Sequence, residues 1–548
     1  MTMRSAVVNC LSGRGAQVGL RCTVCWVDAG DHPSGVRLAE LVAALSLATD
    51  LGLGQPQDHV LRQTVIARRL AAAAGLPDEQ QTAVFYVSLL AWVGCVSDSH
   101  ELATWFGDDQ RLRADSYEVD MTGTSKLWFV LGHVGEGSGP VRRLTMIGRF
   151  LAGGPDRAAR SMLGHCQTTG DIANRLGLGN QVGGALQQAF ERWDGKGVPG
   201  HRAGEQIDAA MRVVQIADDV EVFHRVYGAE AAKEMLRSRR ATEFDPALVD
   251  LFCVHADQLL DGVSEVDAWD AVIAGAGDLG AELGEAELTK VLRVFADYAD
   301  LKSPSWLGHS AGVAALAVGA ARRLGLPASE VTLIERAALV HDLGAIGVSA
   351  GVWDKPAPLS AADRERVRTH PYLTERILAR PARLAEIGAL AGLHHERTDG
   401  SGYPRGLRGD GLSLSARLVA TADAYHALGE GRPHRADIGA ADAAMVLRGE
   451  AAAGRLDGEA VNAVLAAGGH RVRHRPTLPC DLTPREAEIL VLLARGLSNK
   501  EMAERLSISA RTVSSHVEHV YAKIGVSTRG AAAMFAMRHG LVDFRAGA

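Results

Sequence analysis

Histidine and aspartate side chains recur between residues 309 and 423, beside apolar runs, and side chains of these types can bind metal ions. Imidazole and carboxylate together suit iron, manganese, zinc or cobalt better than calcium or magnesium alone. Seven such side chains exceed what one metal ion with an open position needs, so we expect two divalent transition-metal ions. Iron or manganese is the expected metal, and zinc, cobalt and nickel stay open. The expected ligands are His309, His341, Asp342, His370, His394, His395 and Asp423.

Two metal ions held a few ångströms apart perform one particular kind of chemistry. They lower the pKa of a water that bridges them, and they hold a phosphoryl group for in-line attack. The ligand set therefore predicts hydrolysis of a phosphate ester.

The elements that must position these ligands are expected to be helices. Val331, Ile334, Ala338 and His341 follow one another at i, i+3, i+7 and i+10, which is one face of a helix, and Gly344 is a typical helix end. Aromatic residues make up only 5% of the chain, while small and unbranched apolar residues dominate, so packed helices are favoured over a β-sandwich. We predict an all-α fold class.

An internal repeat organises the chain. His59–Gly94 matches His309–Gly344 at an offset of 250 residues, and Glu191–Pro199 matches Glu396–Pro404 at an offset of 205. The change in offset means that the first copy carries 45 extra residues between its two matching stretches. The sequence therefore predicts tandem copies of one helical domain.

The first copy lacks four of the seven expected ligands. Ala91 and Trp92 stand in place of the first adjacent ligand pair, and Ala189 and Phe190 in place of the second. Alanine and aromatic side chains are the apolar filling expected when a metal cavity becomes ordinary core. We therefore expect a degenerate copy with a structural or regulatory role. The ligands that it retains are His59, His165 and Asp218.

The extra segment of the first copy leaves an alternative open, because it begins with acidic residues and a histidine. These could rebuild a metal site together with His59 and Asp218, or they could form a solvated acidic loop. They are Asp98, His100, Glu101, Asp108 and Asp109.

Residues 285–470 resemble an HD-GYP domain, the metal-dependent phosphodiesterase branch of the HD phosphohydrolase superfamily. The resemblance rests on the pair His341-Asp342 and on the stretch His394–Pro404, and Arg417 and Asp423 occupy the family's "ARI…AD" segment. It implies hydrolysis of a cyclic dinucleotide, cyclic di-GMP. By this resemblance the catalytic residues are His341, Asp342 and Arg417, and the substrate-binding residues are Gly402, Tyr403, Pro404 and Arg417.

The second copy departs from the family at three positions. Ala345 replaces a lysine that contacts substrate phosphate in the family, so charge stabilisation in the transition state should be weaker. Ser305 replaces the glutamate of trinuclear members, which points to a binuclear site. His426 replaces a common second aspartate.

The C-terminal residues predict a helix-turn-helix. Thr483, Pro484 and Glu486 form a capping-box helix start, and two further helices are expected over 499–506 and 510–524 with a short turn between them. Residues 482–541 closely resemble the LuxR-type DNA-binding domain. By this resemblance the second of the two helices reads DNA with Ser514, Ser515 and Glu518 at base edges, and Lys500, Arg511, Thr512 and Lys523 at phosphates.

Charge and composition narrow the function classes further. The net charge of −7 excludes a uniformly basic protein that coats nucleic acid. Residues 481–548 carry nine Lys and Arg against seven Asp and Glu, so the acidic remainder should repel DNA. Binding of paired operator half-sites then requires a homodimer.

Seven scattered cysteines suggest a reducing compartment, and the longest apolar run, Val84–Val96, is too short to span a bilayer. We expect a cytoplasmic protein without a membrane partner.

The chain is long enough for several domains, and its composition shifts give their expected limits. They are a disordered N-terminus 1–35, the degenerate copy 36–261, a linker 262–287, the phosphohydrolase copy 288–470, a linker 471–480, and a four-helix DNA-binding domain 481–548.

Three functions fit these residues. The preferred one is a DNA-binding transcription regulator whose second copy hydrolyses a cyclic dinucleotide. The second is a nucleotide-sensing regulator with little turnover, which Ala345 would permit. The third is a phosphohydrolase for another phosphorylated metabolite.

Overall fold

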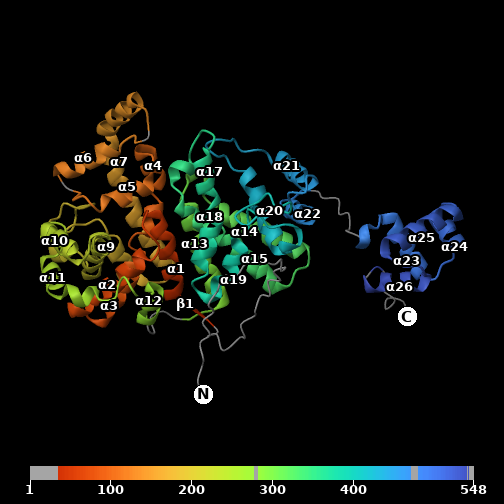
Figure 1. Ribbon diagram of the computed structural model, residues 1–548, viewed down its shortest axis with the longest axis horizontal. Helices are drawn as coiled ribbons and strands as arrows, with labels where there is room; N and C mark the ends of the chain where they lie inside the picture. The colour runs from red at the N-terminus through yellow and green to blue at the C-terminus, as the bar shows by residue number, and fades with distance from the viewer. Residues whose placement is uncertain are drawn as a thin grey trace, which may run out of the picture. The chain divides into compact units, whose positions relative to one another are not determined.

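The computed structural model describes residues 35–121, 123–136, 138–276, 282–470, 479–539 and 541. Helices dominate these residues, which confirms the predicted all-α class. The chain divides into two compact units, residues 1–467 and 468–548 (Figure 1). The N-terminus predicted to be disordered and most of the linker predicted over 471–480 lie outside the described residues.

The first copy of the repeat begins with a short strand and continues in helices. Its helical hairpin is α2 (His59–Ala73) and α3 (Asp78–Leu90). The other elements are β1 (Val36–Arg37), α1 (Leu38–Gly52), η1 (Val93–Val96), α4 (Ser99–Phe106), α5 (Asp109–Ser116), α6 (Gly123–His133), α7 (Pro140–Arg175), α8 (Gly179–Leu186), η2 (Gly204–Gln206), α9 (Ala209–Tyr227), α10 (Ala229–Arg239), α11 (Pro246–Leu260) and α12 (Ala268–Ala276).

The second copy repeats the same helices. Its hairpin is α14 (His309–Arg323) and α15 (Ala328–Val340), and α20 (Leu414–Leu428) corresponds to α9. The remaining elements are β2 (Glu282–Leu283), α13 (Glu285–Asp300), η3 (Pro304–Trp306), η4 (Leu343–Gly347), α16 (Ala350–Trp353), α17 (Ala361–Arg368), α18 (His370–Leu378), η5 (Ala382–Leu384), α19 (Ala385–Ala391), η6 (Gly409–Gly411), α21 (Ala440–Ala452) and α22 (Gly458–Ala467).

The helix starts show that the repeat is structural. The hairpin helices of the two copies begin at positions exactly one offset of 250 apart, and α9 and α20 begin 205 apart, as the two sequence offsets require. Both hairpins turn at a Gly-Leu-Pro segment whose glycine, Gly75 or Gly325, has positive φ, a conformation that glycine adopts without strain.

The two copies share one hydrophobic core. Buried side chains from α1 to α22 belong to a single contiguous cluster, and β1 pairs with β2 in antiparallel fashion with Val36 opposite Leu283. The range 262–287, predicted as a linker, contains α12, whose Trp269 is buried in that core. The copies are therefore packed against each other.

The C-terminal unit has a separate core built on four helices, which a short 3₁₀ turn precedes. Capping boxes, in which Thr483 pairs with Glu486 and Ser498 with Glu501, fix the first turns of its first two helices. The elements are η7 (Pro479–Asp481), α23 (Pro484–Ala494), α24 (Asn499–Leu506), α25 (Ala510–Ile524) and α26 (Arg529–Arg538).

Within the described part of the chain, no single helix is long and apolar enough to cross a membrane. One bent pair, Asp78–Val96 with Ser99–Phe106, reaches the required length and composition when both parts are counted together. Val84, Phe85 and Leu89 of this pair lie in the hydrophobic core.

Candidate metal centre

The seven predicted ligands come from five places in the second copy, four of them at or near a helix end. His309 begins α14, and His370 begins α18. His341 ends α15 and Asp342 follows it directly, because the chain turns there into η4. The pair His394 and His395 follows α19, and Asp423 lies inside α20. The fold therefore brings together every residue of the predicted ligand set.

One group of ligands consists of His309, His341 and Asp423, whose ligand atoms all lie within 4.8 Å of one another. Nε2 of His309 is 3.4 Å from Oδ1 of Asp423 and 3.7 Å from Oδ2 of Asp342. Nε2 of His341 is 3.4 Å from the same Oδ2. These separations are typical of neighbouring ligands around one cation.

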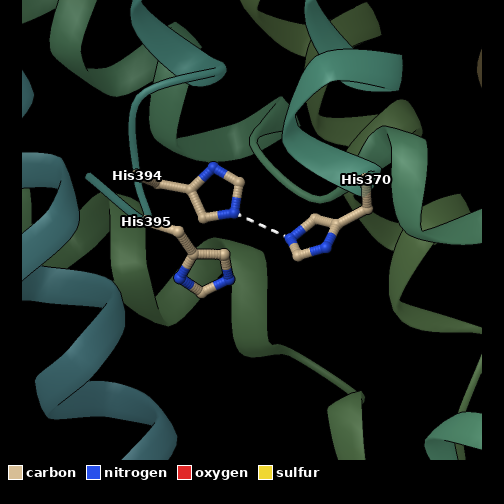
Figure 2. A group of neighbouring side chains, drawn as sticks. All are labelled: His370, His394 and His395. Atoms are coloured by element: carbon tan, nitrogen blue, oxygen red, sulfur yellow. Dashed lines mark hydrogen bonds between the residues drawn. The ribbon is translucent and has the colours of Figure 1, made fainter. Parts of the chain in front are cut away.

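The second group consists of His370, His394 and His395, which face one another in Figure 2. Oδ1 of Asp342 lies 3.3 Å from Nε2 of His370 and 3.4 Å from Nε2 of His394. The two oxygens of Asp342 thus face different histidine groups, so this carboxylate can bridge two cations.

The ring orientations fit metal binding. Nδ1 of His341, His370 and His394 each donates to the carbonyl three residues earlier, at 2.8, 2.5 and 2.7 Å. This bond leaves the lone pair on Nε2, the form that binds metal. Nε2 of His341 is buried and has no hydrogen-bond partner among the described residues. A buried polar atom without a partner is unfavourable, and binding a cation would satisfy it.

The charge states of Asp342 and His341 favour a cation as well. Burial would raise the pKa of Asp342, but His341, His370 and His394 hold that pKa well below its usual range. Burial lowers the pKa of His341 to about 4, so its ring is neutral at pH 7. Ionised carboxylates and neutral imidazoles are the states that ligate divalent metals.

Glu430, which is not among the predicted residues, lies behind this centre. Nδ1 of His309 donates to Oε1 of Glu430 at 3.0 Å, and Arg432 donates to the other oxygen at 2.6 Å. A carboxylate in this position fixes the tautomer of a metal-binding histidine. The spacing of seven residues from Asp423, two helical turns, is the only signal in the sequence that could have suggested it.

Of the predicted substrate-binding residues, Tyr403 lies beside the centre, whereas Arg417 has structural partners instead. The Tyr403 ring lies beside the centre, with its centroid 4.7 Å from that of His395. Gly402 packs so closely that a Cβ there would be 2.4 Å from the backbone nitrogen of Arg397. Pro404 follows in the same loop. Arg417 instead donates to Asp457 at 3.2 Å and to the carbonyl of Gly409 at 2.9 Å.

Arg368, rather than Arg417, lies at the edge of the centre, beside Tyr403. The guanidinium carbon of Arg368 lies 5.2 Å from the centroid of Tyr403, and Arg368 is two residues before His370. Both cations near the centre have carboxylate neighbours: Arg368 lies 3.6 Å from Glu365, and Lys355 forms a closer ion pair with Asp363 at 2.7 Å. The family lysine has no counterpart at Ala345, which is completely buried and whose carbonyl accepts a hydrogen bond from Trp353 Nε1.

In the first copy, the retained ligands have other partners. His59 donates to Glu221 at 2.5 Å and to Asp218 at 3.0 Å, while the rings of Trp92 and Phe190 pack around His165. Among the described residues, the side-chain groups that could hold a metal ion all lie in the second copy.

The acidic insert of the first copy is also not a metal site in the described structure, and it is not a solvated loop throughout. Asp98 and Asp109 are buried and form ion pairs with Arg113. These two carboxylates are thus structural, whereas Glu101 is exposed and Asp108 caps α5.

The predicted DNA-contacting residues lie on α24 and α25, apart from the core of their unit. Three of them have structural partners: Ser514 accepts from Asn499 at 3.0 Å, the hydroxyls of Thr512 and Ser509 are hydrogen-bonded at 2.7 Å, and Lys523 pairs with Glu486 at 2.8 Å. The exposed ones are Lys500, Arg511, Thr512, Ser515, Glu518 and Lys523.

Two families match this chain. Residues 293–460 match the HD domain family, and residues 481–536 match the bacterial regulatory proteins of the luxR family.

Similar proteins extend the first match to both copies. The chain is 31% identical over 403 residues to 3′3′-cGAMP-specific phosphodiesterase 3 of Vibrio cholerae, covering 73% of this chain and 88% of that protein. It is 40% identical over 141 residues to the cyclic di-GMP phosphodiesterase response regulator RpfG of Xanthomonas campestris, covering 25% of this chain and 36% of that protein. A crystal structure of a V. cholerae cyclic GMP-AMP specific phosphodiesterase, V-cGAP3, superimposes with a TM-score of 0.55 and 27% identity, covering 80% of this chain and 99% of that one.

Proposed function

Because the chain belongs to the HD-GYP-like HD-domain family of cyclic dinucleotide phosphodiesterases and ends in a LuxR-family helix-turn-helix domain, we propose that it is a DNA-binding transcription regulator whose second copy hydrolyses a cyclic dinucleotide. The position of Asp342 supports this proposal most directly. Its two oxygens face two histidine groups at 3.3 to 3.7 Å, an arrangement suited to a pair of divalent ions.

The residues that would hold the two ions are the seven predicted ligands, with Asp342 shared. Two ions bound there, iron or manganese first, would lower the pKa of an attacking water and neutralise charge on the phosphoryl group. His341, His370 and His394 would contribute rings of fixed orientation, because backbone carbonyls accept hydrogen bonds from their Nδ1 atoms. Glu430 orients His309 in the same way from its side chain.

The substrate would meet an aromatic face and a cation beside the ligands. Tyr403 presents its ring next to His395, and Arg368 lies over that ring. A purine base can stack on a tyrosine, and a guanidinium can pair with a phosphate. We therefore assign the base and phosphate contacts to these two side chains, and we assign Arg417 to holding the loop at Gly409.

The substrate we propose first is 3′3′-cGAMP, with cyclic di-GMP as the alternative that the HD-GYP resemblance implies. The similar protein named for 3′3′-cGAMP is matched over 88% of its length, whereas RpfG, named for cyclic di-GMP, is matched over 36%. Only the former match is long enough to include both copies.

Hydrolysis is tested with the purified full chain and Mn²⁺. We would incubate it with 3′3′-cGAMP, cyclic di-GMP and p-nitrophenyl phosphate, and separate the products by chromatography. We expect a linear dinucleotide from a cyclic one, abolished in Asp342→Asn and retained in the exposed control Glu386→Gln. Cleavage of p-nitrophenyl phosphate alone would instead support the phosphohydrolase of another metabolite.

A second candidate function is a nucleotide sensor with little turnover. Ala345 favours it, because a completely buried alanine cannot supply the charge that the family lysine gives to substrate phosphate. Calorimetric binding of a cyclic dinucleotide without product formation, in protein carrying its metal, would select this candidate over the first.

The C-terminal unit supplies the DNA-binding half of the proposal. A single short recognition helix buries too little surface for tight specific binding, so we propose that the chain acts as a homodimer on two-fold-related half-sites. Fluorescence anisotropy would compare the full chain with residues 475–548 on the same operator. Equal affinity of the two, with or without nucleotide, would contradict control of the DNA-binding unit by the HD copies.

A further inference from the structure

A helix of the first copy's insert contacts the second copy beside its metal ligands. Asp109, the first residue of α5, is completely buried. Its Oδ1 accepts from Ser349 Oγ at 2.7 Å and from the Ala350 amide at 2.9 Å. Its Oδ2 accepts from Lys302 Nζ, also completely buried, at 2.9 Å, and from Arg113 at 3.0 Å. The carboxylate of Asp109, which belongs to the first copy, therefore accepts hydrogen bonds from all four donors.

The insert also contacts the residues of the second copy that precede and follow Ser349 and Ala350. The Gln110 side-chain amide donates to the carbonyl of Ile346, in η4, at 2.9 Å. Nδ1 of His100, in α4, donates to Asp354, which ends α16, at 2.6 Å. At Gly351 a Cβ would lie 2.0 Å from the carbonyl of Gly107, so α16 packs directly against the insert backbone. Residues 346–354 are therefore held at several points by the first copy.

This segment begins directly behind the metal ligands. Asp342 is followed by η4 and then α16, and the Trp353 indole nitrogen donates to the carbonyl of Ala345 at 3.1 Å. The ring centroid of Trp353 lies 5.6 Å from that of the ligand His370. A shift of α16 would therefore move both the chain that follows Asp342 and the wall behind His370.

Two charged residues of α5 contact equivalent positions of the two copies. At the repeat offset of 250 residues, Gly52 corresponds to Lys302 and Ser99 to Ser349. Arg113, one helical turn after Asp109, donates to the Gly52 carbonyl and to Ser99 Oγ, both at 3.3 Å. Helix α5 thus contacts equivalent positions of both copies, with its cation on the first and its carboxylate on the second.

We propose that Asp109 is a positioning residue for the metal centre of the second copy, so that the degenerate copy completes the active site through α5. The inference rests on the proposed metal centre. Asp109 touches no ligand, and it acts by fixing Ser349 and Ala350, which set the path of residues 343–353.

The test compares two variants that both remove the buried charge pair. Asp109→Asn/Lys302→Met keeps an oxygen acceptor for Ser349 and Ala350, whereas Asp109→Leu/Lys302→Met removes it. Replacing both members of a buried ion pair avoids an unpaired charge. Mn²⁺ binding is measured by electron paramagnetic resonance of the free ion, and circular dichroism verifies the fold.

We expect the asparagine double variant to bind Mn²⁺ within about twofold of the unmodified chain, and the leucine double variant about tenfold more weakly, at the lower end of the range for residues behind metal ligands. The control Asp108→Asn removes a neighbouring charge outside the contact and should bind normally. Equal losses in both double variants, or no loss in either, would overturn the proposal, because a charge-balancing or bystander role predicts these results.

Ser349→Ala gives a second measurement that leaves both buried charges in place. It removes one donor to Asp109 and also the bond that Ser349 Oγ accepts from the Gly351 amide at 3.2 Å, and we expect Mn²⁺ binding to weaken about two- to fivefold, within the range for one or two hydrogen bonds. Unchanged binding in this variant would overturn the proposal even if the leucine double variant does not fold. An unmodified chain that binds no Mn²⁺ would overturn the proposed metal centre itself, and this inference with it.

Discussion

Nε2 of His370 and Nε2 of His394 lie 3.0 Å apart, although each ring already donates a hydrogen bond from Nδ1 to a backbone carbonyl. Two neutral rings in this state turn lone pairs toward each other, which is unfavourable unless a proton or a cation lies between them. Oδ1 of Asp342 faces both nitrogens at 3.3 and 3.4 Å, so a divalent cation bound by these three side chains would relieve the repulsion.

Metal content is the first prediction. The purified full chain should carry about two transition-metal ions per chain, measured by inductively coupled plasma mass spectrometry. Asp342→Asn should lose both ions, because its carboxylate faces both histidine groups, whereas His395→Ala should lose one. The exposed variant Glu386→Gln serves as control. Metal content near zero in protein prepared without chelators would contradict the two-ion centre.

Glu430 provides the second prediction. Glu430→Leu removes the acceptor that holds the Nδ1 proton of His309, so the ion bound by His309, His341 and Asp423 should bind about 10- to 100-fold more weakly. Glu430→Gln keeps an oxygen acceptor and should lose less. Titration with Mn²⁺ measures both variants, and equal affinity of the leucine variant and the unmodified chain would remove Glu430 from the centre.

Arg368 is the basis of the third prediction. If its guanidinium binds substrate phosphate beside Tyr403, Arg368→Ala should raise KM for the cyclic dinucleotide about tenfold, the worth of one charged hydrogen bond, and should change metal content little. The matched control is Arg376→Ala, an exposed arginine two helical turns further along the chain. A normal KM in Arg368→Ala would assign the phosphate contact to another residue.

The fourth prediction concerns pH and the degenerate copy. Burial would raise the pKa of Glu221, but His59 and neighbouring arginines lower it to about 2. Burial would lower the pKa of His59, but Glu221 and Asp218 raise it to about 10. The stabilisation from Glu221 is therefore present above pH 4.5 and is lost as the pH falls toward 2. The stabilisation from His59 is present below pH 6.5 and is lost as the pH rises through about 10.

Thermal unfolding at a series of pH values checks this prediction. The Tm of the unmodified chain should exceed that of Glu221→Gln most between pH 4.5 and 6.5, and the difference should shrink toward both extremes. The exposed Glu205→Gln should follow the unmodified chain. A difference that is constant with pH would show that the His59 ion pair does not contribute to stability.

DNA binding gives the fifth prediction. Arg511→Ala should weaken binding to all sequences similarly and reduce the slope of log K against log salt by about one, because it removes one phosphate contact. Glu518→Ala or Ser515→Ala should instead change which sequences are preferred. Arg495→Ala, exposed at the end of α23, is the control for loss of charge. Anisotropy titrations at several salt concentrations measure all four variants.

Much of the fold could be read from the sequence because it is set by local features. The helical hairpins follow from apolar spacing and from the Gly-Leu-Pro turns, and the first helices of the C-terminal unit follow from the capping boxes at Thr483 and Ser498. The repeat offsets predicted correctly where the corresponding helices of the two copies begin. The prediction of a metal centre also follows from residue type, since imidazole and carboxylate groups are suitable ligands for these metals.

The roles of individual side chains were decided only by the tertiary structure. The sequence does not show that Asp342 divides its two oxygens between two histidine groups, that Glu430 stands behind His309, or that Arg417 is engaged by Asp457. The contact of Asp109 with Ser349 joins residues 240 positions apart, in different copies of the repeat. Spacing along a helix fixes which residues share a face, but the partner of that face depends on how distant helices pack, and local sequence carries no record of it.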